Sequence, residues 1–212
     1  MKKYFLPGLL IILSAHVTCA QSIGNTRPLR EILFDLGGFY SSVFSLNTGG
    51  LDLALEYYPA KKFSTGLALS CANEKGFPNT FSYVDNSPVL RYYQLGWTSA
   101  YNAFRKEKFL VRVTLDNALG LSHLCDNSIK IPQWTKYGYH YVPKEIAKDE
   151  FYILEPGLDF SYRVLSNDHN PDVFITFKCS YRMDFGNYTF GRQKDYTAPY
   201  FALALRLLGF DN

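Results

Sequence analysis

The residues with the most obvious chemical potential are Ser122, His123 and Asp126, which bring a nucleophile, a base and an acid into one short stretch. Such a trio would suit acyl transfer if the three side chains converged. Ser122 and His123 are adjacent, however, and successive side chains of a strand point to opposite faces. We therefore predict a polar rim before a loop here, and no catalytic residue.

The other histidines and cysteines form no metal-binding pattern. His140 and His169 lie in expected loops without a second ligand at the usual spacing, and the chain has no Cys-x-x-Cys pair and no phosphate-binding glycine loop. We expect no cofactor and no metal. Cys71 and Cys125 could meet at one rim and form a disulfide in an oxidising compartment, whereas Cys179 is expected to be a small buried apolar residue.

A second candidate site lies in the long segment 123–150, which carries Trp134, Lys136, Tyr137 and Tyr139. Binding residues are often found on loops held by a rigid scaffold. Aromatic and basic side chains together could bind lipopolysaccharide phosphates, a glycan or a protein. The alternative is that this loop only packs over the mouth of the domain. We take these four residues as the predicted ligand-binding surface.

The elements that must position these residues are strands. Apolar residues alternate with charged or small ones through 109–122 and again through 173–185, and a period of two indicates a strand. Pro156 would interrupt a strand by removing a backbone donor. Eight strands are predicted, approximately at 31–44, 50–58, 63–72, 89–104, 108–122, 151–164, 172–185 and 200–208.

The links between these strands alternate in length. Three are short and polar, at 59–62, 105–108 and 166–171, and three are long, at 73–88, 123–150 and 186–199. The first link of the second set, 45–49, is the short exception. Short turns on one side and long loops on the other, with an even number of strands, are typical of a transmembrane β-barrel.

A soluble barrel or sandwich would alternate too, with its apolar face inward. The polar faces of these strands favour the membrane, because they carry small residues, acids and arginine in place of long hydrated side chains. Buried charges need partners. We expect Arg112, Arg163, Lys178, Arg182 and Arg206 to neutralise Asp52, Glu56, Asp116, Glu155, Asp159 and Asp184 in a polar lumen.

Composition and the N-terminus point to a single exported domain. Charged residues make up 19% and aromatic residues 17% of the chain, so few charges are available to cover a wetted surface. Residues 1–20 read as a signal peptide, with Lys2 and Lys3 before an apolar stretch, followed by an N-terminal segment at 21–30 and the barrel domain at 31–212. Lipid attachment at Cys19 is a weaker alternative. Loss of both lysines lowers the net charge from +3 to +1, which gives no indication of nucleic-acid binding.

Three segments carry a family resemblance: EPGLDFSYR at 155–163, FKCSYRMDFG at 177–186 and YFALALRLLGF at 200–210. With the strand pattern, they make the chain resemble the small outer-membrane β-barrel proteins, the OmpA/OmpX-type and "outer membrane protein beta-barrel domain" group. The resemblance implies an all-β, eight-stranded antiparallel up-and-down transmembrane β-barrel in the outer membrane of a diderm bacterium. It also implies that the last strand is recognised by the barrel-insertion machinery, although Asp211 and Asn212 follow Phe210.

An eight-stranded barrel is just wide enough to be filled by side chains, so we do not expect an open diffusion pore. The predicted function is structural or loop-mediated, without enzymatic activity. Expected partners are outer-membrane lipid and lipopolysaccharide, with an extracellular protein or glycan at the loops. The alternatives are a lipid-modifying outer-membrane barrel enzyme, or a soluble periplasmic β-barrel that binds an apolar ligand.

Overall fold

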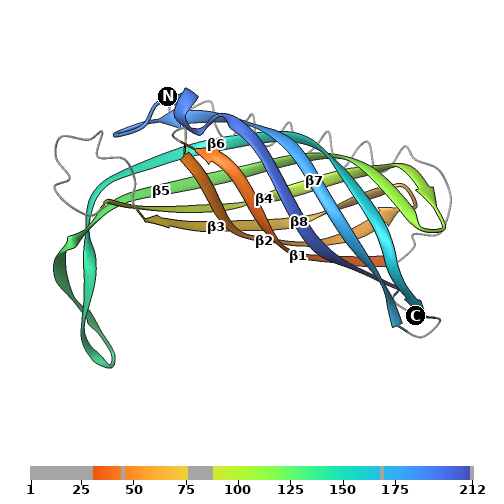
Figure 1. Ribbon diagram of the computed structural model, residues 1–212, viewed down its shortest axis with the longest axis horizontal. Coiled ribbons are helices and arrows are strands. Elements are labelled where there is room, and N and C mark those ends of the chain that lie inside the picture. The colour runs from red at the N-terminus through yellow and green to blue at the C-terminus, as the bar shows by residue number, and fades with distance from the viewer. Residues whose placement is uncertain (1–30, 44–45, 76–87, 168–169, 211–212) are drawn as a thin grey trace.

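Eight antiparallel strands follow one another around a closed barrel in the computed structural model (Figure 1). The structure describes residues 31–43, 46–75, 88–167 and 170–210. Every strand pairs with its neighbours in the sequence, and β1 pairs with β8 to close the ring. The strands are β1 (Glu31–Val43), β2 (Leu46–Ala60), β3 (Phe63–Lys75), β4 (Pro88–Lys106), β5 (Phe109–Thr135), β6 (Gly138–Asn167), β7 (Asn170–Asn187) and β8 (Ala198–Phe210).

The predicted fold class is confirmed, and all eight predicted strands are present. The start of β1 pairs with the end of β8, through Glu31 and Phe210, so both ends of the barrel domain lie at one end of the barrel. The turns at this end are short, as between β2 and β3 and between β4 and β5. The predicted signal peptide and the segment 21–30 lie outside the described residues.

The prediction of a long loop at 123–150 is wrong. β5 and β6 continue through this segment as a paired hairpin that ends at Thr135 and Gly138. Figure 1 shows the hairpin projecting beyond the end of the barrel that lies opposite the start of β1 and the end of β8. Gly138 has a φ of 114°, a conformation that glycine adopts readily, and it therefore permits the tight turn at the tip.

The two faces of the wall differ in the way that a transmembrane barrel requires. Alternate residues face the interior, and these include nearly all the buried polar and charged side chains. The intervening residues face outward and are large and apolar, such as Leu36, Leu55, Leu95, Leu119, Phe177 and Leu203. A soluble barrel would show the reverse arrangement, so the soluble alternative does not fit this structure. In the described part of the chain, no helix is both long and apolar enough to cross a membrane.

The interior is layered along the barrel axis. At the end where β1 begins and β8 ends, it holds an apolar cluster of Leu33, Tyr58, Leu110, Phe174 and Leu208. At the opposite end it holds a larger cluster rich in aromatic residues, including Phe39, Tyr92, Phe151, Tyr196 and Tyr200. Charged residues occupy the space between these clusters.

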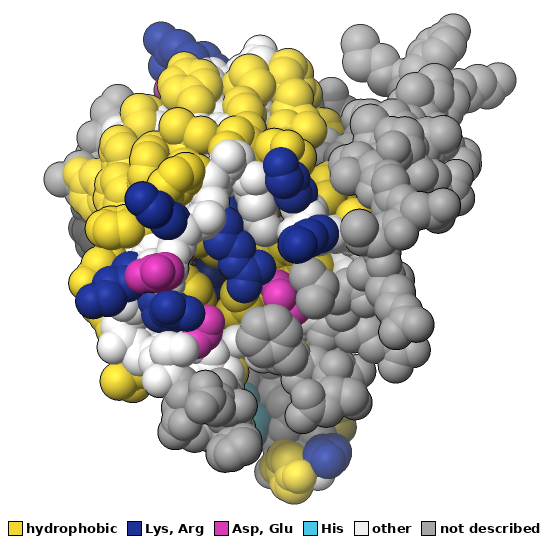
Figure 2. Space-filling model, turned by 90° about the vertical axis from the view of Figure 1, so that its right-hand side faces the viewer, with side chains coloured by type: hydrophobic (Ala, Val, Ile, Leu, Met, Phe, Trp, Pro, Cys, Tyr) yellow, Lys and Arg dark blue, Asp and Glu magenta, His cyan; other side chains and the backbone are white. Residues whose placement is uncertain are grey.

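Charged residues also gather at the end of the barrel where β1 begins and β8 ends. Figure 2 views this end and shows lysine and arginine side chains, with acidic ones among them, gathered beside the hydrophobic side chains. Arg105 contacts Glu31 at 3.2 Å, and Arg163 contacts Asp172 at 3.1 Å. Arg163 therefore belongs to this rim and not to the middle of the lumen, where the sequence placed it.

The three described cysteines are free. Cys71 pairs with Tyr93 of β4, whereas Cys125 of β5 pairs with Val89, four residues further along β4. A whole strand and this offset separate the two residues, and the disulfide that the sequence left open is not formed in the structure. Cys179 is half-buried on its strand and is not the fully buried residue that was expected.

Pro156 interrupts the sheet as predicted. The pairing of β6 with β7 passes from Leu154 and Met183 to Gly157 and Ser180, and it omits Glu155 and Pro156. Proline has no N–H to donate to the neighbouring strand. The register is the same on both sides of this gap, and Glu155 faces the lumen, where it is buried.

The outward position of Leu203 gives a direct test of the membrane-facing wall. Leu203 lies near the middle of β8 and is 61% exposed. Replacing it with arginine should lower the free energy of unfolding in lipid bilayers by about 2–4 kcal/mol, the cost of a charge near the bilayer midplane. Urea titration in liposomes measures the change, and Leu203→Phe serves as the matched control. A change below about 0.5 kcal/mol for Leu203→Arg, as at an ordinary wetted surface, would contradict a lipid-facing wall.

Candidate functional site

The interior is held together by a network of ion pairs centred on Arg206. This fully buried side chain binds Asp35 of β1 through two parallel hydrogen bonds, both of 2.8 Å. It also donates to Asp159 of β6 at 2.6 Å and to Ser161 at 2.9 Å. A guanidinium group matches a carboxylate in this two-point geometry. One side chain of β8 thereby connects β1 with β6 across the barrel.

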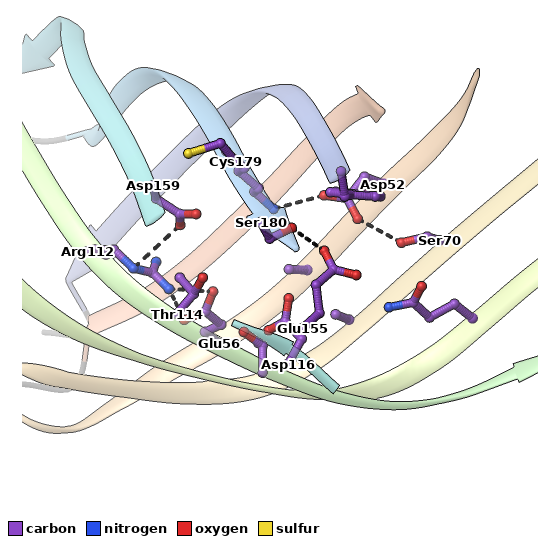
Figure 3. Close-up of a pocket in the computed structure, with 16 residues that line it drawn as sticks. Asp52, Glu56, Ser70, Arg112, Thr114, Asp116, Glu155, Asp159, Cys179 and Ser180 are labelled. Atoms are coloured by element: carbon purple, nitrogen blue, oxygen red, sulfur yellow. Dashed lines mark hydrogen bonds and ion pairs between the residues drawn. The ribbon is translucent and has the colours of Figure 1, made fainter. Parts of the chain in front are cut away.

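Two further cations extend the network to other strands (Figure 3). Lys178 of β7 lies 3.1 Å from Asp35 and 2.8 Å from Asp52 of β2. Arg112 of β5 binds both oxygens of Glu56, at 2.6 and 2.9 Å, from the opposite wall. These pairs cross-link strands that are not neighbours in the sheet. Hydroxyl groups complete the shell of the acids, as where Ser70 donates to Asp52 at 2.9 Å and Ser64 to Glu56 at 2.6 Å.

Arg182 links the charged layer to the aromatic cluster. Its Nε donates to Glu155 at 3.1 Å, and Glu155 also accepts a hydrogen bond from Ser180. The guanidinium carbon lies 5.1 Å from the ring centre of Tyr92 and 4.8 Å from that of Tyr200. Desolvated cation–π contacts of this kind are stabilising. They allow a buried arginine to lie among aromatic rings.

Between the described residues, the charged layer of the lumen holds one small cavity. The cavity lined by Asp52, Glu56, Arg112, Asp116, Glu155 and neighbouring residues has a volume of about 30 Å³. That volume can hold ordered water but not a solute. The apolar clusters at both ends close the interior further. The structure is therefore a filled barrel.

The sequence predicted most members of this network, including Arg206 at its centre, but missed one of the acids that Arg206 binds. Arg112, Lys178, Arg182 and Arg206 all bind interior acids, as expected. In the part of the chain that the structure describes, Asp116 and Asp184 form no ion pair. Asp35 was missed, although it lies between Phe34 and Leu36 in an alternating strand, which was the available signal.

Asp149 closes the mouth of the barrel at the hairpin end. This fully buried carboxylate accepts hydrogen bonds from the backbone N–H groups of Thr189, Phe190 at 3.2 Å and Gly191 at 2.9 Å. It also accepts one from the hydroxyl of Tyr196 at 2.7 Å. These donors all belong to the segment between β7 and β8, here called the lid (188–197), which contains the short helix α2 (Gln193–Tyr196).

The lid packs its aromatic rings into the barrel. Tyr196 is buried, with its ring centre 4.6 Å from that of Phe151 and 5.4 Å from that of Tyr188. Burial raises the pKa of Tyr196, so its hydroxyl stays protonated and donates to Asp149. Burial, with the nearby charges of Asp184 and Asp149, likewise raises the pKa of Tyr188 to about 12. The sequence assigned this segment to a plain loop and gave no signal of its latch.

The predicted ligand-binding residues lie at the tip of the β5–β6 hairpin. Trp134 is 69% exposed, Tyr137 82% and Tyr139 67%. Trp134 pairs with Tyr139 across the strands, and their ring centres are 4.7 Å apart. Lys136 lies in the turn with its ammonium 4.8 Å from the ring centre of Tyr137. The structure thus brings the four residues together in solvent.

The candidate catalytic trio does not converge. Ser122 is buried on the inner face, whereas His123 faces outward and contacts Glu145 at 2.6 Å. Asp126 accepts hydrogen bonds from the backbone and the hydroxyl of Ser128, which lower the pKa of its carboxyl group. Among the described residues, no group of three His, Cys, Asp or Glu side chains is placed to hold a metal ion.

Comparison with known proteins gives matches in structure alone. No family model and no curated protein matches the chain. The chain is similar to Ail, the attachment invasion locus protein of Yersinia pestis, in complex with the heparin analogue sucrose octasulfate (TM-score 0.50, 12% identity, 85% of this chain and 99% of that chain). Another crystal structure of Ail gives a TM-score of 0.49 at 13% identity and the same coverage. Neisserial surface protein A gives 0.48 at 11% identity, over 84% of this chain and 94% of that one.

At these identities the likeness concerns the fold. The chain has the fold of the small eight-stranded outer-membrane β-barrel proteins of the OmpA/OmpX type, as its sequence pattern predicted. The shared architecture agrees with the closed ring of eight strands and with the apolar outer wall.

Removing the central cation should destabilise the barrel strongly. Arg206→Met leaves Asp159 and Asp35 buried with fewer partners, and breaking one side of a buried ion pair costs about 3–5 kcal/mol. Unfolding in urea, followed by the loss of the folded band on unheated gels, measures the effect. Lys148→Met, which removes the cation of an exposed pair with Glu150, is the control and should cost far less, because exposed ion pairs contribute little to stability. Equal effects of the two substitutions would show that the network does not hold the barrel together.

Removing the latch should open the lid without unfolding the barrel. Hydrogen bonds to a charged group contribute about 1.5–3 kcal/mol, so Asp149→Ala should raise the open population of the lid about 10- to 100-fold. Trypsin cleavage at Arg192 or Lys194 reports this opening. Asp126→Ala, which removes an acid that bonds Ser128 and not the lid, is the matched control. Unchanged cleavage in Asp149→Ala would contradict the latch.

Proposed function

We propose that the chain is an integral protein of the outer membrane of a diderm bacterium, which acts through its β5–β6 hairpin and not as a pore. The observation that carries this proposal is the combination of an apolar outer wall, a filled polar interior and one hairpin that extends beyond the barrel. A barrel without a channel has no transport path. Its surfaces at the two ends are then the places where it can act.

The hairpin is built as an exposed interaction element. β5 leaves its pairing with β4 at Asp126, and β6 begins its pairing with β7 at Glu150, so the strands between these points pair only with each other. The base of the hairpin is held by the barrel, where Asp149 binds the lid, but no other strand pairs with its tip in the described sheet. An isolated two-stranded hairpin is only marginally stable in water. Its exposed Trp134, Tyr137 and Tyr139 would gain from a partner surface, because exposed aromatic patches commonly mark interaction sites.

Several partners follow from this placement. The outer wall contacts outer-membrane lipid and, on the outer leaflet, lipopolysaccharide. β8, which ends at Phe210 and closes the barrel against β1, is the strand that the barrel-insertion machinery would engage during biogenesis. The hairpin would bind an extracellular protein or glycan. The structure of Ail with a heparin analogue supports the idea that a barrel of this shape can present a glycan-binding surface.

The geometry gives less support to the enzymatic alternative. Ser122 and His123 face opposite sides of the wall, and His123 is engaged by Glu145. A lipid-modifying enzyme needs a nucleophile, a base and an acid in contact at the outer rim. We therefore infer a non-enzymatic role.

The orientation of the barrel can be tested with single cysteines in a variant whose three mature-chain cysteines are replaced by alanine. Tyr137→Cys, at the hairpin tip, should react with a membrane-impermeant maleimide on intact cells. Lys62→Cys, in the exposed β2–β3 turn at the other end, should react only after the outer membrane is permeabilised. Labelling of Lys62→Cys alone on intact cells would contradict the proposed topology, and labelling of neither after permeabilisation would contradict exposure of both ends.

A further inference from the structure

The hairpin tip has an unusual charge pattern. Between Asn127 and Lys144 the chain contains Lys130, Lys136 and Lys144 but no aspartate or glutamate. Acids resume only at Glu145, which is engaged by His123. The tip of the hairpin therefore carries two positive charges, Lys130 and Lys136, with no acid in its own sequence, whereas Lys144 lies across from Asp126. A surface of this kind attracts anions, and the attraction is screened by salt.

The strand register sorts the aromatic residues onto one face. Residues paired across two strands lie on the same side of the ribbon. On one side, every second pair counted from the turn is Trp134 with Tyr139, Pro132 with Tyr141, and Lys130 with Pro143. This face, which we call the Trp134 face, thus presents three aromatic rings, two prolines and a lysine in a row. The opposite face carries Ile131 with Val142 and Gln133 with His140. Rings are therefore concentrated on one side.

The size of the Trp134 face favours a narrow ligand. Trp134, Tyr139 and Tyr141 are each about two-thirds exposed, so at 150–250 Å² per aromatic side chain they offer roughly 400 Å². A stable protein interface needs about 800 Å² from each partner. The edges of the ribbon also discourage a partner strand, because Pro132 and Pro143 lie in it and edge prolines and lysines oppose added strands. A flat, extended ligand fits these limits better than a protein.

We propose that the Trp134 face of the hairpin binds an anionic carbohydrate. This inference rests on the proposed function, in which the hairpin is the interaction element. The C–H groups of a sugar ring would lie on the electron-rich faces of Trp134 and Tyr139, because an aromatic ring has a negative face. The ammonium groups of Lys130 and Lys136 would pair with sulfate, phosphate or carboxylate groups of the carbohydrate. Two sources offer this chemistry: lipopolysaccharide of the same membrane, and an acidic polysaccharide outside the cell.

The test uses the full-length barrel in phosphatidylcholine vesicles with three probes: fluorescent heparin, purified lipopolysaccharide and neutral dextran. Heparin, lipopolysaccharide or both should bind, dextran should not, and binding should weaken as salt is raised. Trp134→Ala should weaken binding at least tenfold, and the Lys130→Gln, Lys136→Gln double variant should weaken it several-fold and reduce its salt dependence. Ile131→Ala on the opposite face is the matched control and should change affinity less than twofold.

The probes also separate the outcomes. Binding of heparin but not lipopolysaccharide indicates an external polysaccharide, and the reverse indicates the protein's own membrane; both support the proposal. Three results would overturn the proposal. Dextran binds as tightly as the anionic probes, Trp134→Ala and Ile131→Ala weaken binding equally, or neither anionic probe binds. If Tyr137→Cys is nevertheless labelled on intact cells, the hairpin is still exposed at the cell surface, so the carbohydrate inference alone has failed and the proposed function stands. Heat-modifiable mobility of each variant confirms that its barrel is folded.

Discussion

The structure depends on one constraint: in lipid, the wall must satisfy the hydrogen bonds of its own backbone and carry mostly apolar side chains on its outer face, so the charged side chains of the wall have to be placed inside. Closure of β8 onto β1 meets the first requirement by removing the sheet edge. Eight strands leave an interior only wide enough for side chains. Charges in that interior are tolerable only as pairs. Arg206, bound to Asp35 and Asp159, and Arg112, bound to Glu56, meet this requirement across the barrel.

The same constraint accounts for the two ends. Apolar residues close the interior at the end where β1 begins and β8 ends. The lid closes it at the hairpin end through Tyr196 and Asp149. With packed side chains at both ends and a cavity of about 30 Å³ between the described residues of the charged layer, the barrel is a filled scaffold. Among the described residues, the β5–β6 hairpin is the part that extends beyond the barrel, and its tip exposes large aromatic side chains. The division between a filled scaffold and one projecting element supports an interaction role.

The strands could be predicted from the sequence because a period of two is local and the membrane makes it regular. The pairing of charges could not, because the partner of Arg206 depends on how the ring closes, which brings Asp35 beside it from 171 residues away. The hairpin was missed for a different reason. Its segment contains Pro132, Pro143 and Gly138, and neither of its faces is uniformly apolar, so the alternation that indicates the other strands is lost. The latch at Asp149 was missed with it, since this residue was assigned to the same loop.

The most direct test of the account uses the two tryptophans of the chain, because Trp97 faces outward from the wall of β4 and Trp134 lies at the hairpin tip. Each can be observed alone, in Trp134→Phe and Trp97→Phe variants reconstituted in vesicles. The account predicts that brominated lipid chains quench Trp97 but not Trp134, and that aqueous iodide quenches Trp134 but not Trp97. Quenching of Trp97 by iodide, without quenching by the brominated chains, would show that the apolar wall does not face lipid and would contradict the transmembrane barrel.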